Sequence, residues 1–365
     1  MAPALRVGLA GFGAVTRSLA PSIQGMPDVE LTAVAAPRQG PRDEARERYG
    51  VETYASVEAM CASPDVDVVW VCTPNAFHAE HTIVAAEHGK HVICEKPMAV
   101  SLDEAQAMAE AIGRNGVRYV QAHSKLFDPP VRRMREIVSS GRLGRVIQIN
   151  TWEFKPWISG APRRAADVDT AQGGGVVYRQ GPHQAEIVRG IGGGMVRSVR
   201  ALAGRWHPAF PLGEGDYSAF LEFEDGTAAT MVFNGYGYFD ITELTWGIGE
   251  GGQQKEVAES SQGGEGRRRQ PFYGLTVVSC ERGDIRQSPD GLYVYTDAGR
   301  EEVALEPSGP GRREIAELKE ALAEDRPVFP DERWGMASLE VVLAILGSSR
   351  QRREVLLSHQ VPCPF

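Results

Sequence analysis

The first 125 residues alternate short apolar segments with longer amphipathic ones, and this alternation restricts the possible folds more than any other feature. Nearly continuous apolar runs rich in β-branched residues are typical of strands in a parallel sheet that is covered on both faces. Helical patterns separate these runs, and the one at residues 101–116 opens with a capping box, Ser101 and Glu104. The order predicts an α/β fold with a doubly wound domain over residues 1–125. The expected strands are Leu5–Gly11, Val29–Ala36, Val66–Pro74, Lys90–Pro97 and Arg118–His123.

Beyond residue 125 the pattern changes to alternating apolar and polar residues with turn signals such as Asp225-Gly226. Segments 145–154, 217–237 and 291–296 therefore predict antiparallel strands with one open face, in a second domain over residues 126–365. Residues 249–270 contain almost no large apolar side chain and predict a mobile loop. Two C-terminal helical segments are candidates to pack back on the first domain.

Composition narrows the class of protein. A net charge of −9 argues against a nucleic-acid partner, and the absence of an apolar run near 20 residues argues against a membrane one. The N-terminus has no signal-peptide layout, and five scattered cysteines give neither a disulfide framework nor a zinc site. We therefore expect a cytoplasmic protein with reduced thiols, no metal and a small-molecule substrate.

Glycines follow the first strand at once. Gly8, Gly11 and Gly13 have the spacing that lets a pyrophosphate approach the backbone at a helix N-terminus, although Thr16 stands where a third glycine or alanine is usual. A plain tight turn is the alternative. The remaining candidate cofactor contacts in this turn are Phe12, Ala14 and Val15.

The end of the second strand bears on the choice of cofactor. An NAD site would normally place an acid there, but Ala36 occupies the position and Arg38 and Arg42 follow. A guanidinium suits a 2′-phosphate, so the sequence favours NADP slightly over NAD, unless Arg38 is merely solvated.

Three further strand ends carry polar residues, and ligands of open α/β sheets bind outside such ends. The expected cofactor contacts are Cys72, Thr73, Pro74, Asn75 and His78 after one strand, Glu95, Lys96 and Pro97 after the next, and His123 after the last. Lys96 would act as an acid/base if burial lowers its pKa, whereas a solvated surface lysine is the alternative. His78 with His81 has helical spacing, but no third metal ligand accompanies the pair.

Taken together, "GLAGFG", "CTPNAFHAEH", "GKHVICEKPMAVSLDEA" and "GGGVVYRQGPHQ" resemble the glucose–fructose oxidoreductase/inositol dehydrogenase (Gfo/Idh/MocA) family. The resemblance implies an NAD(P)-dependent dehydrogenase with a Rossmann domain and a C-terminal α/β domain on an open, mostly antiparallel sheet. That sheet commonly forms the contact of a homodimer or homotetramer. The resemblance also implies Lys96 as the catalytic lysine and His183 as the histidine of the second domain.

The second half is similar to the phthalate-type cis-dihydrodiol dehydrogenases, which act in aromatic breakdown. That similarity implies oxidation of a carboxylated cis-dihydrodiol to a catechol. A sugar, inositol or other polyol dehydrogenase is the alternative within the family. A non-catalytic nucleotide-binding protein is a more distant one.

Arg179 departs from the family pattern. Members that act on polyols carry an aspartate four residues before the histidine, and an arginine there suits a substrate carboxylate instead. Arg163 and Arg164 are candidates for a second anion contact, with Trp157 beside the substrate ring and Trp152, Tyr236 and Tyr238 as further candidate walls. The alternatives are that Arg179 pairs with Glu186 or another internal acid, and that Arg163 and Arg164 belong to an exposed loop.

Overall fold

The computed structural model describes residues 4–158, 160, 163–208, 210–254, 269–306 and 313–364. It divides into two compact units, one of Met1–Ser124 with Pro310–Leu339 and one of Lys125–Gly309 with Glu340–Phe365. Each unit is made from two stretches of chain, in place of the single boundary after residue 125 that the sequence suggested. We propose these two units as the domains.

The sheet of the first unit is parallel throughout, as predicted, and has the strand order β3-β2-β1-β4-β5-β6 among the described residues. The order reverses at β1, whose neighbours are β2 and β4, so the carboxyl ends of β1 and β4 flank the topological switch point. The strand that the sequence did not predict is the short β3 at one edge. The bounds are β1 Leu5–Ala10, β2 Val29–Ala35, β3 Glu52–Tyr54, β4 Val68–Val71, β5 His91–Glu95 and β6 Tyr119–Ala122.

Helices connect these strands, and their ends follow local chemistry. The Ser101 hydroxyl accepts the N–H of Glu104 at 3.2 Å and caps α5, while the Glu104 carboxylate accepts the N–H of Val100 instead of that of Ser101. Gly116 ends the same helix in the left-handed conformation. The helices are α1 Ala14–Gln24, α2 Gln39–Tyr49, α3 Val57–Cys61, α4 His78–Glu87, α5 Leu102–Asn115 and, from the C-terminal stretch, α8 Arg313–Glu324.

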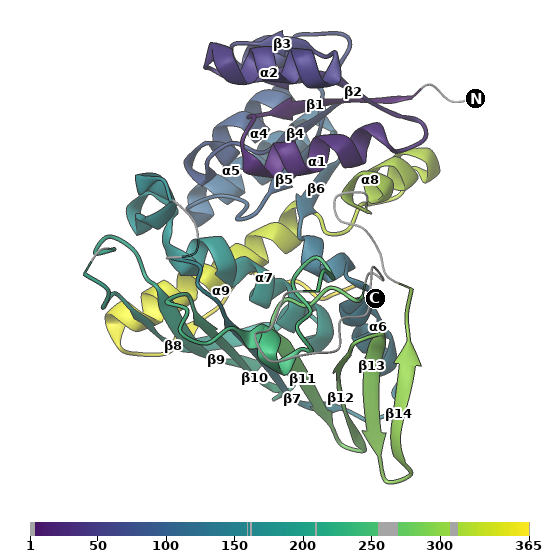
Figure 1. Ribbon diagram of the computed structural model, residues 1–365, viewed down its shortest axis with the longest axis vertical. Helices are drawn as coiled ribbons and strands as arrows, with labels where there is room; N and C mark the ends of the chain where they lie inside the picture. The colour runs from purple at the N-terminus through teal and green to yellow at the C-terminus, as the bar shows by residue number, and fades with distance from the viewer. Residues whose placement is uncertain are drawn as a thin grey trace. The chain divides into compact units, whose positions relative to one another are not determined.

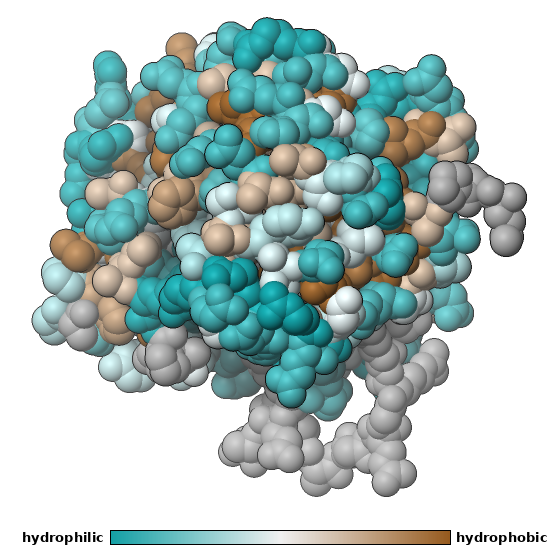
Figure 2. Space-filling view, turned by 90° about the horizontal axis from the view of Figure 1, so that it is seen from above, coloured by the Kyte–Doolittle hydropathy of each residue, from teal (hydrophilic) through white to brown (hydrophobic). Residues whose placement is uncertain are grey.

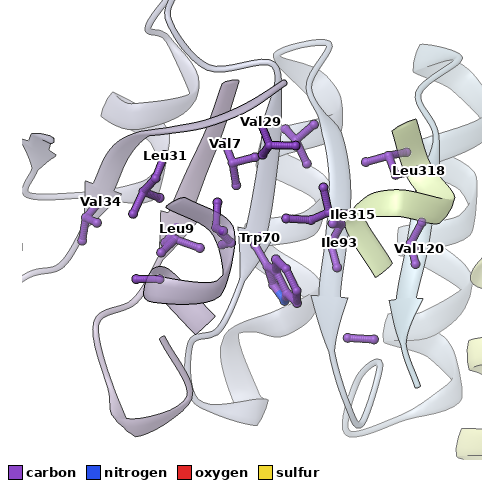
Figure 3. Packing of buried hydrophobic residues seen from close by; sticks show 14 of the residues in the cluster. Val7, Leu9, Val29, Leu31, Val34, Trp70, Ile93, Val120, Ile315 and Leu318 are labelled. Atoms are coloured by element: carbon purple, nitrogen blue, oxygen red, sulfur yellow. The ribbon is translucent and has the colours of Figure 1, made fainter. Parts of the chain in front are cut away.

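The core of this unit lies between the sheet and its helices (Figure 3). Leu9, Trp70 and Ile93 from the central strands are at most 1% exposed. Ile315 and Leu318 of α8 belong to the same buried cluster, so the C-terminal stretch completes the packing of the first unit.

The second unit is built on a nine-stranded sheet with the order β14-β13-β12-β11-β7-β10-β9-β8-β15 among the described residues. The pairing of β7 with β10 is parallel and the other pairings are antiparallel, so the mostly antiparallel sheet is confirmed. The strands are β7 Val146–Phe154, β8 Val196–Gly204, β9 Asp216–Phe223, β10 Ala228–Asn234, β11 Leu275–Cys280, β12 Gly283–Ser288, β13 Gly291–Thr296, β14 Gly299–Ala304 and β15 Val355–Leu356.

One face of this sheet is covered by α7 (Gly175–Gly192), beside α6 (Pro129–Ser139) (Figure 1). The Gln184 amide on α7 donates to the carbonyls of Val232 at 3.0 Å and Thr151 at 3.2 Å, and its oxygen accepts the Tyr217 hydroxyl. These bonds hold α7 against the middle of the sheet. The helix α9 (Glu332–Gln351) passes from the first unit to the second between Leu339 and Glu340.

None of the described helices is long and apolar enough to cross a membrane. Hydrophilic residues cover most of the face seen in Figure 2, and hydrophobic ones occur there in small separate groups. Most of the loop predicted to be mobile, residues 255–268, lies outside the described residues.

Candidate active site

The glycine turn after β1 has the shape that a dinucleotide requires. Gly11 has φ +93°, and a Cβ there would lie 3.0 Å from the Cys72 carbonyl oxygen, so this position needs glycine. Gly13 caps the N-terminus of α1 with open space around its missing side chain. The exposed N–H groups of a helix start attract a pyrophosphate, so the residues present fit a dinucleotide.

Thr16 replaces the usual third small residue without disturbing this turn. Its side chain is fully buried, and its hydroxyl donates to the Gly11 carbonyl at 2.9 Å. The side chain of Phe12 packs edge-on against Tyr49, so only the backbone of Phe12 remains for a cofactor. Gly8 serves helix–sheet packing, since a Cβ there would lie 2.9 Å from Met60 Sδ.

Two arginines occupy the end of β2. Arg42 donates to the carbonyls of Ala36 at 2.6 Å and Pro37 at 2.9 Å, which fixes its guanidinium beside the strand end. Arg38 is exposed and stands at the N-cap of α2. Of the two arginines that the sequence places here, Arg42 is the more firmly held.

His78 ties two loops together. It is 1% exposed, with Nδ1 2.7 Å from the Pro97 carbonyl oxygen and Nε2 2.9 Å from that of Thr73. Both ring nitrogens thus engage backbone. We therefore interpret His78 as a residue that positions the Cys72–Asn75 and Glu95–Pro97 loops, in place of the cofactor contact that the sequence suggested.

Lys96 follows β5 at the same edge of the sheet. It is half-buried between Glu95 and the buried Pro97, with a cis peptide bond between Lys96 and Pro97. His123, after β6, is 1% exposed. The expected cofactor residues therefore cluster at the carboxyl ends of β1, β2, β4, β5 and β6, where parallel strands bring them to one edge.

In the second unit, a tight turn starts α7. Gly175 has φ +77°, and a Cβ there would lie 3.0 Å from the Glu214 carboxylate. A Cβ on Gly174 would overlap the Ala166 carbonyl oxygen. These glycines pack the helix start against the preceding loop, which carries Arg163 and Arg164.

Three arginines gather around Asp167. Arg179 Nη1 lies 3.4 Å from its carboxylate, and Arg164 donates to both of its oxygens, at 2.9 and 3.0 Å. Arg163 donates to the Trp157 carbonyl at 2.8 Å and lies 4.3 Å over the Trp157 ring. Asp167 is thus an internal acid that pairs with Arg179.

The charge balance of this arginine cluster (Arg163, Arg164, Arg179 and Asp167) is positive, with three guanidinium groups against one carboxylate. Burial and the charge of Arg179 lower the pKa of Arg163. Burial opposes ionisation of Asp167, but the Arg164 hydrogen bonds and the Arg179 charge lower its pKa overall. An added anion would relieve this excess of positive charge.

His183 lies one helical turn after Arg179. Its Nδ1 is 3.1 Å from the fully buried Glu186 carboxylate, and its ring lies 4.8 Å from that of Tyr273. The Tyr273 hydroxyl donates to Gln180 Oε1 at 2.9 Å. Sequence reasoning missed Tyr273, because nothing in the sequence pairs it with Gln180, which lies 93 positions away.

The aromatic residues considered as walls of a substrate site differ in how exposed they are. Tyr236 is buried and its ring lies tilted against that of the exposed Trp206, with 3.8 Å between ring centroids. Tyr238 is fully exposed, and Trp152 is half-buried on β7.

Among the described residues there is no group of three metal-ligating side chains. His81 instead pairs with the Thr73 hydroxyl at 3.0 Å.

Known proteins match the chain over most of its length. Residues 5–123 match the oxidoreductase family with an NAD-binding Rossmann fold, and residues 131–243 match the GFO/IDH/MocA C-terminal domain. A 1-carboxy-3-chloro-3,4-dihydroxycyclohexa-1,5-diene dehydrogenase from Comamonas testosteroni is 29% identical over 98% of both chains. An inositol 2-dehydrogenase from Rhizobium meliloti is 24% identical over 97% of this chain and 99% of its own.

Solved structures agree with this assignment. The crystal structure of a Bordetella bronchiseptica RB50 protein matches with a TM-score of 0.90 and 36% identity, over 97% of this chain and all of the other. A levoglucosan dehydrogenase in complex with NADH shares the fold, with a TM-score of 0.82 and 21% identity over 97% of this chain and 99% of its own. The chain belongs to the Gfo/Idh/MocA family and is an NAD(P)-dependent oxidoreductase.

Proposed function

We propose that the protein oxidises one secondary alcohol of a carboxylated cyclic cis-diol, and that the product rearomatises to a catechol. The observation that carries this proposal is the arginine cluster, because guanidinium groups suit a carboxylate better than the neutral hydroxyls of a polyol. The name of the Comamonas relative describes a substrate of this kind.

Lys96 is the proposed acid/base. It follows a parallel strand at the edge of the sheet where dinucleotides bind, and the family resemblance gives it this role. The hydroxyl proton passes to the Lys96 amine while the cofactor, when bound, supplies the hydride acceptor. His183 orients a substrate hydroxyl, and Arg179 with Arg163 or Arg164 holds the carboxylate.

NADP is the cofactor that we favour. Arg38 and Arg42 stand at the end of β2, where an NAD site would place an acid, and α2 begins at the same point. A 2′-phosphate would meet two guanidinium groups and a helix N-terminus.

A homodimer or homotetramer through the open face of the nine-stranded sheet completes the proposal. Leu202 and Phe220 are about half exposed there, and the row of paired positions from Leu202 runs through Ser218 to the apolar Val232, Trp152 and Leu275. A sheet face of this kind is normally covered.

All five cysteines are free thiols, which supports a cytoplasmic location.

The second candidate is an inositol or sugar dehydrogenase, which the names of several relatives favour. A substrate panel separates the two candidates. Faster NADP reduction with a carboxylated cis-dihydrodiol than with its decarboxylated analogue, inositol or glucose supports the first. Preference for a neutral polyol supports the second.

A further inference from the structure

His183 has an acidic partner on its own helix. Glu186 follows it by three residues, which places both side chains on one face of α7. Oε1 of Glu186 lies 3.1 Å from Nδ1 of His183, and the glutamate is fully buried. Arg179, four residues before His183, has no hydrogen-bond acceptor to offer the imidazole.

Burial is the largest influence on Glu186 and raises the pKa of its carboxyl well above the usual value, while neighbouring donors counteract part of this shift. The backbone N–H groups of Lys125 and Leu126 donate to its two oxygens at 3.3 and 3.4 Å. The positive charge of Lys125, which is 9% exposed, also favours the ionised form, whereas burial and the charge of Asp128 oppose it. The other charged or titratable groups of this cluster are Tyr273 against the His183 ring, Lys155 over the Tyr273 ring, and Glu153 and Glu250 beside Lys155.

We propose that Glu186 is a positioning residue, which keeps a proton on Nδ1 of His183 and leaves Nε2 as a hydrogen-bond acceptor for a substrate hydroxyl. Once Glu186 is ionised it only accepts hydrogen bonds, so the ring nitrogen that faces it must then donate. A neutral imidazole has one N–H, and its second nitrogen then carries a lone pair. The acid that orients the histidine thus follows it in this chain. The role of the substrate hydroxyl rests on the proposed function.

This arrangement predicts how the pair responds to pH. Burial raises the pKa of Glu186 well above that of an exposed glutamate, which favours an additional proton on the Glu186–His183 pair. The acceptor form of Nε2 exists above the pKa of the pair and is lost as the pH falls through it. Removing the carboxylate lowers this pKa, and removing the positive charge of Lys125 raises it.

The test is ¹⁵N NMR of the whole chain with labelled histidine, titrated with acid, with the His183→Asn variant to assign the signal. Wild-type protein at high pH should show His183 protonated on Nδ1. The titration midpoint should fall by about one pH unit or more in Glu186→Gln and rise in Lys125→Met. The tautomer measurement in wild type does not depend on whether the Glu186 and Lys125 variants fold.

Glu340→Gln is the matched control. Glu340 is also a buried acid that meets a histidine, with 2.9 Å to His359 Nδ1, and it also accepts backbone N–H groups, from Ser358 and His359. The midpoint of His183 should not move in this variant. Wild-type His183 protonated on Nε2 at high pH, or the same midpoint in Glu186→Gln as in wild type, overturns the proposal.

The NMR readout does not require turnover, so it separates this inference from the proposed function. If the titration behaves as expected but no carboxylated diol is oxidised, the substrate assignment fails and the role of Glu186 stands. If the diol is oxidised, the acid limb of kcat/KM should move in the same directions as the NMR midpoint. An acid limb that stays fixed in both variants contradicts the positioning role.

Discussion

Replacing Arg179 by glutamine should weaken catalysis only with substrates that carry a carboxylate. The change removes one cation and keeps a polar side chain of similar reach. A charge-assisted hydrogen bond contributes about 1.5–3 kcal/mol, so kcat/KM should fall about 10- to 100-fold with a carboxylated cis-dihydrodiol. With the decarboxylated analogue the loss should be less than about threefold, since no charged partner is removed.

The fold should tolerate this change. Asp167 loses a 3.4 Å neighbour but keeps both hydrogen bonds from Arg164. Because the Arg179 side chain is 27% exposed, we expect a loss of less than about 1 kcal/mol in the free energy of unfolding, measured with urea. Arg205→Gln is a suitable control, because Arg205 also pairs with one acid, Glu214, in the same unit.

The assay is initial-rate NADP reduction with both substrates for wild type, Arg179→Gln and Arg205→Gln. The loss of kcat/KM in Arg179→Gln should depend on the substrate carboxylate. Equal losses with both substrates would refute a contact between Arg179 and that carboxylate, and Arg179 would then act only as a structural partner of Asp167.

Further predictions concern the first unit. Lys96→Met should lower kcat by about 10²–10⁴-fold while cofactor binding, followed by fluorescence, changes little, and unchanged turnover would exclude Lys96 as the acid/base. Arg38→Glu should lower the ratio of kcat/KM for NADP to that for NAD by about tenfold or more, and an unchanged ratio would exclude a 2′-phosphate contact. Gly11→Ala should cost about 1–3 kcal/mol of stability in thermal unfolding, because its φ of +93° is unfavourable for alanine and a Cβ would meet Cys72. Thr16→Val should cost about 1 kcal/mol by removing the hydroxyl bond to Gly11, and an unaltered Tm would show that this bond contributes nothing.

Local patterns were sufficient to predict the sheet of the first unit. Buried parallel strands are apolar throughout, so Val68–Val71 and His91–Glu95 stood out, and the residues after them had to meet at one edge. The three-residue β3, Glu52–Tyr54, escaped prediction because it is too short to show a period. The packing of Ile315 and Leu318 into the core of the first unit could also not be predicted. An amphipathic pattern shows that a helix has a buried face, but not which distant segment that face contacts.

The candidate site shows the same limit. His183 was identified from the family resemblance of its segment, and Arg179 from its departure from the family pattern four residues earlier. The pairing of Arg179 with Asp167 was left open, because a loop intervenes. The contact between Glu186 and the backbone of Lys125 joins residues 61 positions apart, and only the folded chain reveals it.

The most direct test of the proposed function is the substrate panel with wild-type enzyme. Purified protein and NADP are mixed with a carboxylated cis-dihydrodiol, its decarboxylated analogue, inositol and glucose, and the products are identified by mass spectrometry. We predict that the carboxylated diol gives a catechol with a kcat/KM about tenfold or more above that of every other substrate. Equal rates with and without the carboxylate, or a higher kcat/KM with inositol or glucose, would contradict the account.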